Sequence, residues 1–153
     1  MKKYEFTGET KQVELLFRTA TLHRIRAVVE FGLVKVGDLG GWIEKEENLS
    51  HEGKAWVWGN AEVWGNAKVF SASHVLVIGA IGSRNDFTTF YRDKDGEITV
   101  KCGCFLGKID KFLEKVTATH GNSKYALVYR AAVEVAKLQI DLSGEAPEQN
   151  NND

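Results

Sequence analysis

The chain has 153 residues, of which 43% are hydrophobic and 27% charged, and its formal net charge at pH 7 is −1. This size and composition fit one globular unit, or a short repeat module with a small companion domain. The balanced charge excludes a protein that binds nucleic acid through bulk positive charge, so any anion site would have to be local. No apolar run approaches the roughly 18 residues that span a bilayer, and the start, MKKYEFTGETKQ, lacks the apolar region of a secretory signal. We therefore expect no membrane partner and a cytoplasmic location.

Residues 1–36 are predicted to form strands and turns, since they contain the runs KYEFTG, VELLFR and LHRIRAVVEF. Arg24 and Arg26 lie two positions apart in the last run and therefore share one face of a strand. Guanidinium groups bind phosphate and carboxylate through paired hydrogen bonds. The two arginines are either a candidate anion site or part of a solvated strand face.

An internal repeat of six residues begins at Ala55 and reads AWVWGN, AEVWGN, AKVFSA and SHVLVI. A fixed period indicates units that each pack against their neighbours, and we predict a repeat module over residues 37–82. The positions expected to point inward are the small residues and the valines that follow them by two: Ala55, Ala61, Ala67, Ser73, Val57, Val63, Val69 and Val75. Eighteen residues, about one turn of a three-sided β-helix, separate Leu39 from Val57, so Leu39 is predicted to stack below Val57 and Val75 in an irregular lead-in coil.

An aromatic residue follows each of the first three inward valines, namely Trp58, Trp64 and Phe70. Strand alternation places these side chains outside, where a row of large aromatics favours association. We expect the C-terminal half or other subunits to cover them, and we predict a homo-oligomer, with a trimer or a multiple of it favoured. Alternatively, Trp58 or Trp64 stacks the base of a nucleotide.

Residues 83–141 are predicted to form a β-hairpin followed by two helices. The strands DFTTFYR and EITVKCGCF flank an Asp-Gly turn, and apolar residues recur at helical spacing in KIDKFLEKVTATHG. The sequence HGNS can end this helix and cap a second one that runs to about Ile140. Residues 142–153 are polar, contain the only proline, and are predicted to be a disordered tail. The expected fold class is mainly β with C-terminal helices (α+β), a short hexapeptide-repeat β-helix joined to a β-hairpin and two helices.

The best candidate binding loop is IGSRND, where the repeat gives way to a strand. Its Gly-Ser-Arg run offers backbone N–H groups, a hydroxyl and a guanidinium, which are the components of a small anion site. An ordinary structural turn is the alternative. The candidate ligand-binding residues here are Ser83, Arg84, Asn85, Thr88 and Thr89.

No catalytic motif is present, because the sequence lacks a Ser/His/Asp order, a Walker loop, GxGxxG, HExxH and an EF-hand loop. No cofactor and no metal site are expected. Cys102 and Cys104 are interpreted as small buried residues, since a thiolate zinc site would need His120 or carboxylates to complete it. The acidic residues that could hold a metal are interpreted as a solvated surface: Asp38, Glu44, Glu46 and Glu47.

Five blocks occur in order along the chain: LHRIRA, KVGDLGGWIEKEENLSHEGKAWVWGNAEVWGNAKV, IGSRNDFTTFY, VKCGCFLG and THGN. In these blocks the chain resembles a set of small proteins encoded by phages and prophages, in which a variable number of hexapeptide units precedes a C-terminal α+β module. The resemblance covers most of residues 4 to 140. It implies a left-handed β-helix-like fold and a phage context, but it implies no activity and no catalytic residue.

These features predict a non-catalytic, phage-encoded, oligomeric binding protein that sequesters a small anionic ligand, such as a nucleotide immune signal of the host, as an anti-defence function. Arg84 would pair with phosphate while Ser83 and the threonines donate hydroxyls. The first alternative is a structural or protein-interaction module without a small ligand. The second is a hexapeptide-type acyltransferase with His51 or His74 as general base.

Overall fold

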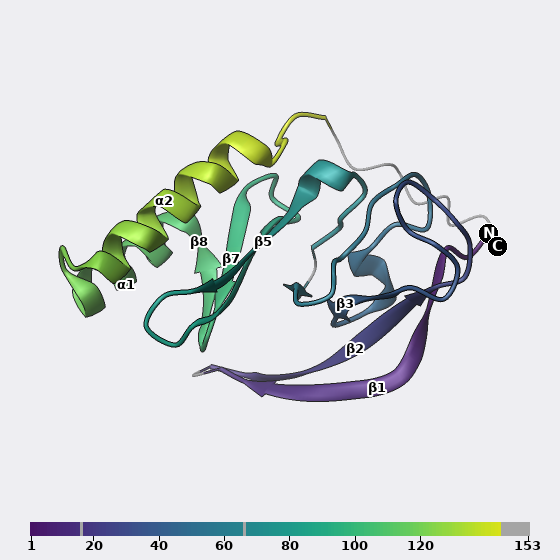
Figure 1. The fold of residues 1–153 in the computed structure, drawn as a ribbon, viewed down its shortest axis with the longest axis horizontal. Helices are drawn as coiled ribbons and strands as arrows, with labels where there is room; N and C mark the ends of the chain where they lie inside the picture. Colours follow the sequence, from purple (N-terminus) through teal and green to yellow (C-terminus); the bar gives the residue numbers. More distant parts are fainter. Residues whose placement is uncertain (16, 66, 145–153) are drawn as a thin grey trace.

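The computed structural model describes residues 1–15, 17–65 and 67–144. These residues form two four-stranded sheets and two C-terminal helices, which confirms the mainly β, α+β class. In Figure 1 the helices lie against the second sheet, and the N-terminal hairpin lies on the far side of that sheet. One hydrophobic core fills the space between the second sheet and the helices, and another joins the first sheet to the repeat.

The first sheet has the strand order β1-β2-β3-β4. Strands β1 (Tyr4–Glu14) and β2 (Thr19–Ala27) form a long antiparallel hairpin. Strand β3 (Leu39–Ile43) pairs antiparallel with β2, and the short strand β4 (Glu62–Val63) pairs parallel with β3. The parallel pair is where the repeat joins the sheet.

The repeat forms an irregular coil with two 3-10 turns, η1 (Glu46–Asn48) and η2 (Ala72–His74). Ile43 pairs with Val63 and Leu49 with Val69, both in parallel, so partners are twenty residues apart rather than the expected eighteen. The stacking predicted for Leu39 is therefore wrong, and this side chain is 50% exposed. The inward alanines and valines are buried as predicted: Ala55, Ala61, Ala67, Val57, Val63, Val69 and Val75.

A buried asparagine, Asn48, joins the two layers of the coil. Its Oδ1 accepts hydrogen bonds from the backbone N–H groups of Glu44 (3.1 Å) and Lys45 (2.9 Å). Its Nδ2 donates to the carbonyl oxygens of Gly65 and Ala67, each at 2.9 Å. A fully buried amide with these four partners is satisfied, and it fixes the register in which the irregular layers meet.

An ion pair between Arg18 and Glu44 fastens the β1–β2 hairpin to the coil. Arg18 donates to both carboxylate oxygens, at 2.6 and 2.9 Å, and the N–H of Gly65 also donates to Glu44. The Arg18 hydrogen bonds, with help from Gly65 and against partial burial, hold the pKa of Glu44 below its ordinary value of 4.5.

Because the folded pKa is lowered, Glu44 stabilises the fold above its ordinary pKa of 4.5, and this contribution is lost as the pH falls through the lower folded value. We expect Glu44→Gln to lower the free energy of unfolding at pH 7 by about 2 kcal/mol, since it leaves a charged donor without its partner. Urea titrations at pH 7 and pH 3 measure this difference. A penalty that is equally large at pH 3 would contradict the assignment.

The aromatic residues predicted to point outward do not form an exposed row. Trp64 is only 1% exposed and packs against Leu15, Ala20 and Leu22 of the N-terminal hairpin. Phe70 is half-buried against the ring of His74, and only Trp58, at 48%, is substantially exposed. Trp64 lies outside the valine core of the coil, as predicted, and the N-terminal hairpin, which the prediction did not name, covers it. The homo-oligomer therefore stays a prediction, and the row of exposed aromatic residues that was expected to join its subunits is absent from the described residues.

The second sheet has the antiparallel order β5-β6-β7-β8, with β5 (Val75–Ile81), β6 (Asp86–Arg92), β7 (Ile98–Cys102) and β8 (Phe105–Lys108). The predicted hairpin is confirmed as β6–β7. Strand β5 lies within the range predicted for the repeat, but it pairs with β6 and belongs to this sheet. Its run VLVIGAI favours a strand more strongly than another coil corner.

The two predicted helices are confirmed as α1 (Ile109–His120) and α2 (Lys124–Gln139). Their buried faces meet the sheet in one core that includes Phe90, Val100, Phe112, Tyr129 and Val133. No helix of the described residues is long and apolar enough to cross a membrane.

The predicted disordered tail begins at residue 142, and its residues 145–153 lie outside the described residues. The buried side chain of Arg92, which is 7% exposed, binds the tail just before residue 145. Its guanidinium donates to the carbonyl oxygens of Ser143, at 2.7 Å, and of Gly144. The first residues of the tail are therefore fixed against the second sheet.

Candidate functional site

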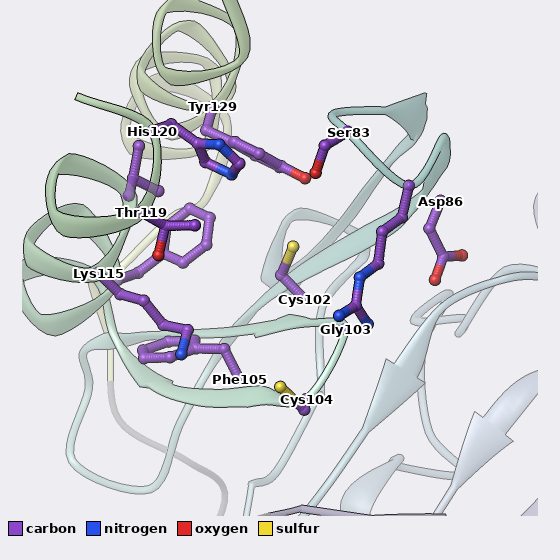
Figure 2. A pocket seen from close by; sticks show the side chains of 13 residues that line it. Ser83, Asp86, Cys102, Gly103, Cys104, Phe105, Lys115, Thr119, His120 and Tyr129 are labelled. Atoms are coloured by element: carbon purple, nitrogen blue, oxygen red, sulfur yellow. The ribbon is translucent and has the colours of Figure 1, made fainter. Parts of the chain in front are cut away.

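A cavity of about 190 Å³ lies between the β5–β6 turn, the β7–β8 turn and the two helices (Figure 2). Its lining combines polar and charged side chains with apolar ones. The polar residues that matter below are Ser83, Arg84, Asp86, Lys115, His120 and Tyr129. The apolar wall includes Phe105, Phe112 and Val116.

The β5–β6 turn brings Ser83 and Arg84 to the cavity. The N–H of Asn85 donates to the carbonyl oxygen of Gly82 at 3.2 Å, and both residues have positive φ, +80° at Gly82 and 50° at Asn85. A Cβ on Gly82 would lie 1.8 Å from the Tyr129 hydroxyl oxygen. Glycine is therefore required for the turn to rest on Tyr129 of α2.

The hydroxyl of Tyr129 lies at the centre of the polar groups. Burial, followed by the neighbouring Cys102 thiol and Asp86, raises the pKa of Tyr129 to about 12. Thr88 donates a hydrogen bond to the Cys102 Sγ, at 3.4 Å. In Figure 2 the Tyr129 and Ser83 hydroxyls lie beside each other. Tyr129 remains protonated at neutral pH and is able to donate a hydrogen bond.

Positive charge enters the cavity from two sides. Arg84 comes from the β5–β6 turn and Lys115 from α1, whereas Asp86 is the one carboxylate among the lining residues. The Arg84 guanidinium lies 3.8 Å from the point where Gly103 would carry a Cβ, which is the distance of an ordinary van der Waals contact. His120 stacks on the Tyr129 ring, with centroids 5.8 Å apart. With His120 neutral, the lining carries one net positive charge.

Of the five candidate ligand-binding residues predicted here, only Ser83 and Arg84 line the cavity, beside Asp86 of the same loop. Asn85 shapes the turn through its positive φ, and Thr88 is buried and reaches the cavity only through Cys102. Thr89 is buried and accepts a hydrogen bond from the N–H of Glu62 at 3.0 Å, on the face of the sheet toward the coil. Thr89 therefore does not face this cavity, because neighbouring strand residues point to opposite faces.

The two arginines of β2 lie outside this cavity. Arg26 donates to Glu5 at 2.6 Å, and Arg24 donates to Glu9 at 3.4 Å and lies over the ring of Trp42. Both guanidinium groups are thus paired with carboxylates of β1 in the first sheet. Trp58 and Trp64 belong to the coil and are not among the lining residues, so neither stacks on a ligand held here.

The histidines of the acyltransferase alternative are both engaged within the fold. His74 is 2% exposed, and burial and then the Arg92 guanidinium lower its pKa. Its side chain belongs to η2 and packs against the ring of Phe70 inside the fold. His51 accepts a hydrogen bond from the N–H of Lys3 at Nδ1, and its Nε2 lies 2.7 Å from Glu46.

The helical part of the cavity was missed by sequence reasoning. Phe112, Lys115, Val116, Thr119 and His120 recur at intervals of three and four along α1, which marks a single helix face. The apolar residues of this face predict packing, and only the fold shows that the face also lines a cavity. Cys102 is half-buried and Cys104 exposed, so the predicted burial of both is wrong for Cys104, which lies in the β7–β8 turn.

Cys102, Cys104 and His120 line the same cavity. Within the described ranges, however, no three His, Cys, Asp or Glu side chains are arranged to hold a metal ion. The chain matches no protein-family model and no curated protein. The resemblance to phage and prophage proteins stays a prediction, and the function is argued below from the cavity.

Proposed function

We propose that the protein is a non-catalytic binding protein for a small anionic ligand, held in the cavity between the β5–β6 turn and the helices. The observation that supports this most is that Arg84 and Lys115, from separate elements, line the same cavity together with apolar side chains. A guanidinium and an ammonium group bind phosphate or carboxylate oxygens through charge-assisted hydrogen bonds.

The chemistry of the lining narrows the ligand class. The rings of Phe105 and Phe112, whose centroids are 5.4 Å apart, would hold a small apolar or aromatic group behind the anion. The hydroxyls of Ser83 and Tyr129 would donate to the same anion, while Asp86 would accept from a ligand hydroxyl. The ligand is therefore a compact organic phosphate or carboxylate.

The volume of the cavity limits how much of a nucleotide could bind in it. Pockets that enclose ligands of drug size usually measure about 300–1,000 Å³, and this cavity measures about 190 Å³. It would take the phosphate end of a nucleotide and leave the base outside. Sequestration of a host nucleotide signal would then depend on the phosphate contact, not on stacking against the tryptophans.

The surroundings of the titratable groups favour binding over catalysis. His120 lies against the rings of Tyr125 and Tyr129, an arrangement that supplies no carboxylate to orient it as a general base. The raised pKa of Tyr129 keeps that hydroxyl in its neutral, donating form. These groups are therefore suited to binding an anion through hydrogen bonds and not to transferring protons.

Phenyl phosphate is the first probe, because it combines the two ligand features in a small molecule. We expect saturable, one-site binding by isothermal titration calorimetry. We expect Arg84→Ala to weaken this binding about 10-fold to 100-fold, as loss of a charge-assisted contact worth about 1.5–3 kcal/mol requires.

Arg26→Ala is the matched control, because it removes a guanidinium from the first sheet, where Arg26 pairs with Glu5. It should change the affinity by less than about twofold, since exposed pairs contribute little. Binding that both variants weaken equally would indicate general charge attraction and overturn the site. The absence of binding for phenyl phosphate, inorganic phosphate and benzoate alike would overturn the proposed function.

A further inference from the structure

A stripe of apolar side chains runs along the outer face of α2. Ala131, Val135 and Leu138 are exposed, with exposed fractions of 47% at Val135 and 88% at Leu138. Val128, which is half-buried, continues the stripe toward the start of the helix. Figure 1 shows α2 at the outside of the molecule, and the opposite face of the helix supplies its buried residues.

The spacing of this stripe is that of a coiled-coil seam. Its members, Val128, Ala131, Val135 and Leu138, are separated by three, four and three residues. This alternation places the side chains in line along one side of a helix, where they fit between those of a partner helix. One exposed leucine is ordinary on a protein surface, but a continuous seam exposed to water favours association.

The seam is complementary to itself when two copies of α2 run antiparallel. In that register Val128 faces Leu138 of the second copy, and Ala131 faces Val135, so each layer pairs a smaller residue with a larger one. The ends are complementary in charge, because Lys124 begins the helix and Asp141 follows its end. The chain beyond residue 144, EAPEQNNND, has no large apolar residue that would fill the seam instead.

We propose that two copies of this chain associate through the outer face of α2, packed antiparallel. A helix of 16 residues is about 24 Å long, and one such pair buries less than the ~1,200 Å² of a typical stable interface. The dimer is therefore reversible, with a dissociation constant on the order of micromolar to hundreds of micromolar. The four seam residues are not among those that line the anion cavity, so the association is independent of that site.

Sedimentation velocity of the full chain over a concentration series tests the dimer. The mean mass should rise from 17.1 kDa toward twice that value. Leu138→Glu should weaken association about 50-fold or more, because it would bury an unpaired charge, while its melting temperature stays unchanged. Leu33→Glu is the matched control, since Leu33 is 89% exposed and lies far from α2 in the sequence, and it should leave the dimer intact.

Charge reversal tests the direction of packing. In the antiparallel register Glu134 lies beside Glu134 of the second copy, whereas a parallel pair would place it beside Gln139. A mixture of wild-type and Glu134→Lys chains should therefore form heterodimers above the statistical ratio, by about twofold. A statistical ratio would overturn the antiparallel register. A monomer mass at all concentrations, or a dimer that Leu138→Glu leaves unchanged, would overturn the proposal.

Discussion

Trp64→Ala is expected to lower the free energy of unfolding by about 4 kcal/mol, the typical cost of removing a buried large aromatic. The side chain is 1% exposed, and Leu15, Ala20 and Leu22 pack on it from the N-terminal hairpin. The substitution would leave a cavity between the hairpin and the coil. Urea denaturation followed by circular dichroism measures the loss.

Two further substitutions test whether the cost of Trp64→Ala comes from the burial of the ring rather than from a hydrogen bond of the indole N–H. Trp58→Ala removes a side chain that is 48% exposed and should cost less than about 1 kcal/mol. Trp64→Phe should cost less than Trp64→Ala, because it keeps most of the ring and the indole N–H has no hydrogen-bond partner among the described residues. If Trp58→Ala were the more damaging change, the hairpin would not cover the coil at Trp64.

Gly82→Ala is expected to cost about 3 kcal/mol and to abolish phenyl phosphate binding. The new Cβ would lie 1.8 Å from the hydroxyl oxygen of Tyr129 and 2.3 Å from its Cζ, so Tyr129 or the turn must move. Either movement separates Arg84 from the rest of the cavity. Thermal unfolding and calorimetry report the two losses.

Gly96→Ala measures how much of the stability loss of Gly82→Ala comes from placing a side chain at positive φ. Gly96 has a φ of +71°, close to the +80° of Gly82, but nothing lies within 4 Å of its Cβ position. It should cost only about 1 kcal/mol, the usual penalty for a side chain at positive φ, and leave binding unchanged. Equal losses for the two substitutions would show that Tyr129 does not limit the turn.

The C-terminal half was the more predictable part of the fold. Local signals are strong there, since an Asp-Gly turn joins β6 to β7 and helical spacing with a glycine at position 121 fixes α1. The inward valines and alanines of the repeat were also predicted correctly, because a regular period shows which positions share an environment.

Long-range packing explains what the sequence did not show. The period of six predicts that Trp64 points away from Val63, but it does not show that the β1–β2 hairpin lies over that side. The role of Asn48 depends on carbonyl groups from the next layer of the coil. Similarly, Ser83 and Arg84 were predicted from a local motif, whereas Lys115 and Tyr129 join them only through the packing of helices on the sheet.

The central claim is that a small anion binds at the cavity lined by Arg84, and amide chemical shifts measured by NMR during a phenyl phosphate titration test it most directly. We predict saturable shifts at residues 82–86, at Gly103 and near His120, with the β1–β2 hairpin unaffected. Shifts confined to Arg24 and Arg26, or to the coil around Trp58, would contradict the account. So would the absence of saturable shifts at the cavity.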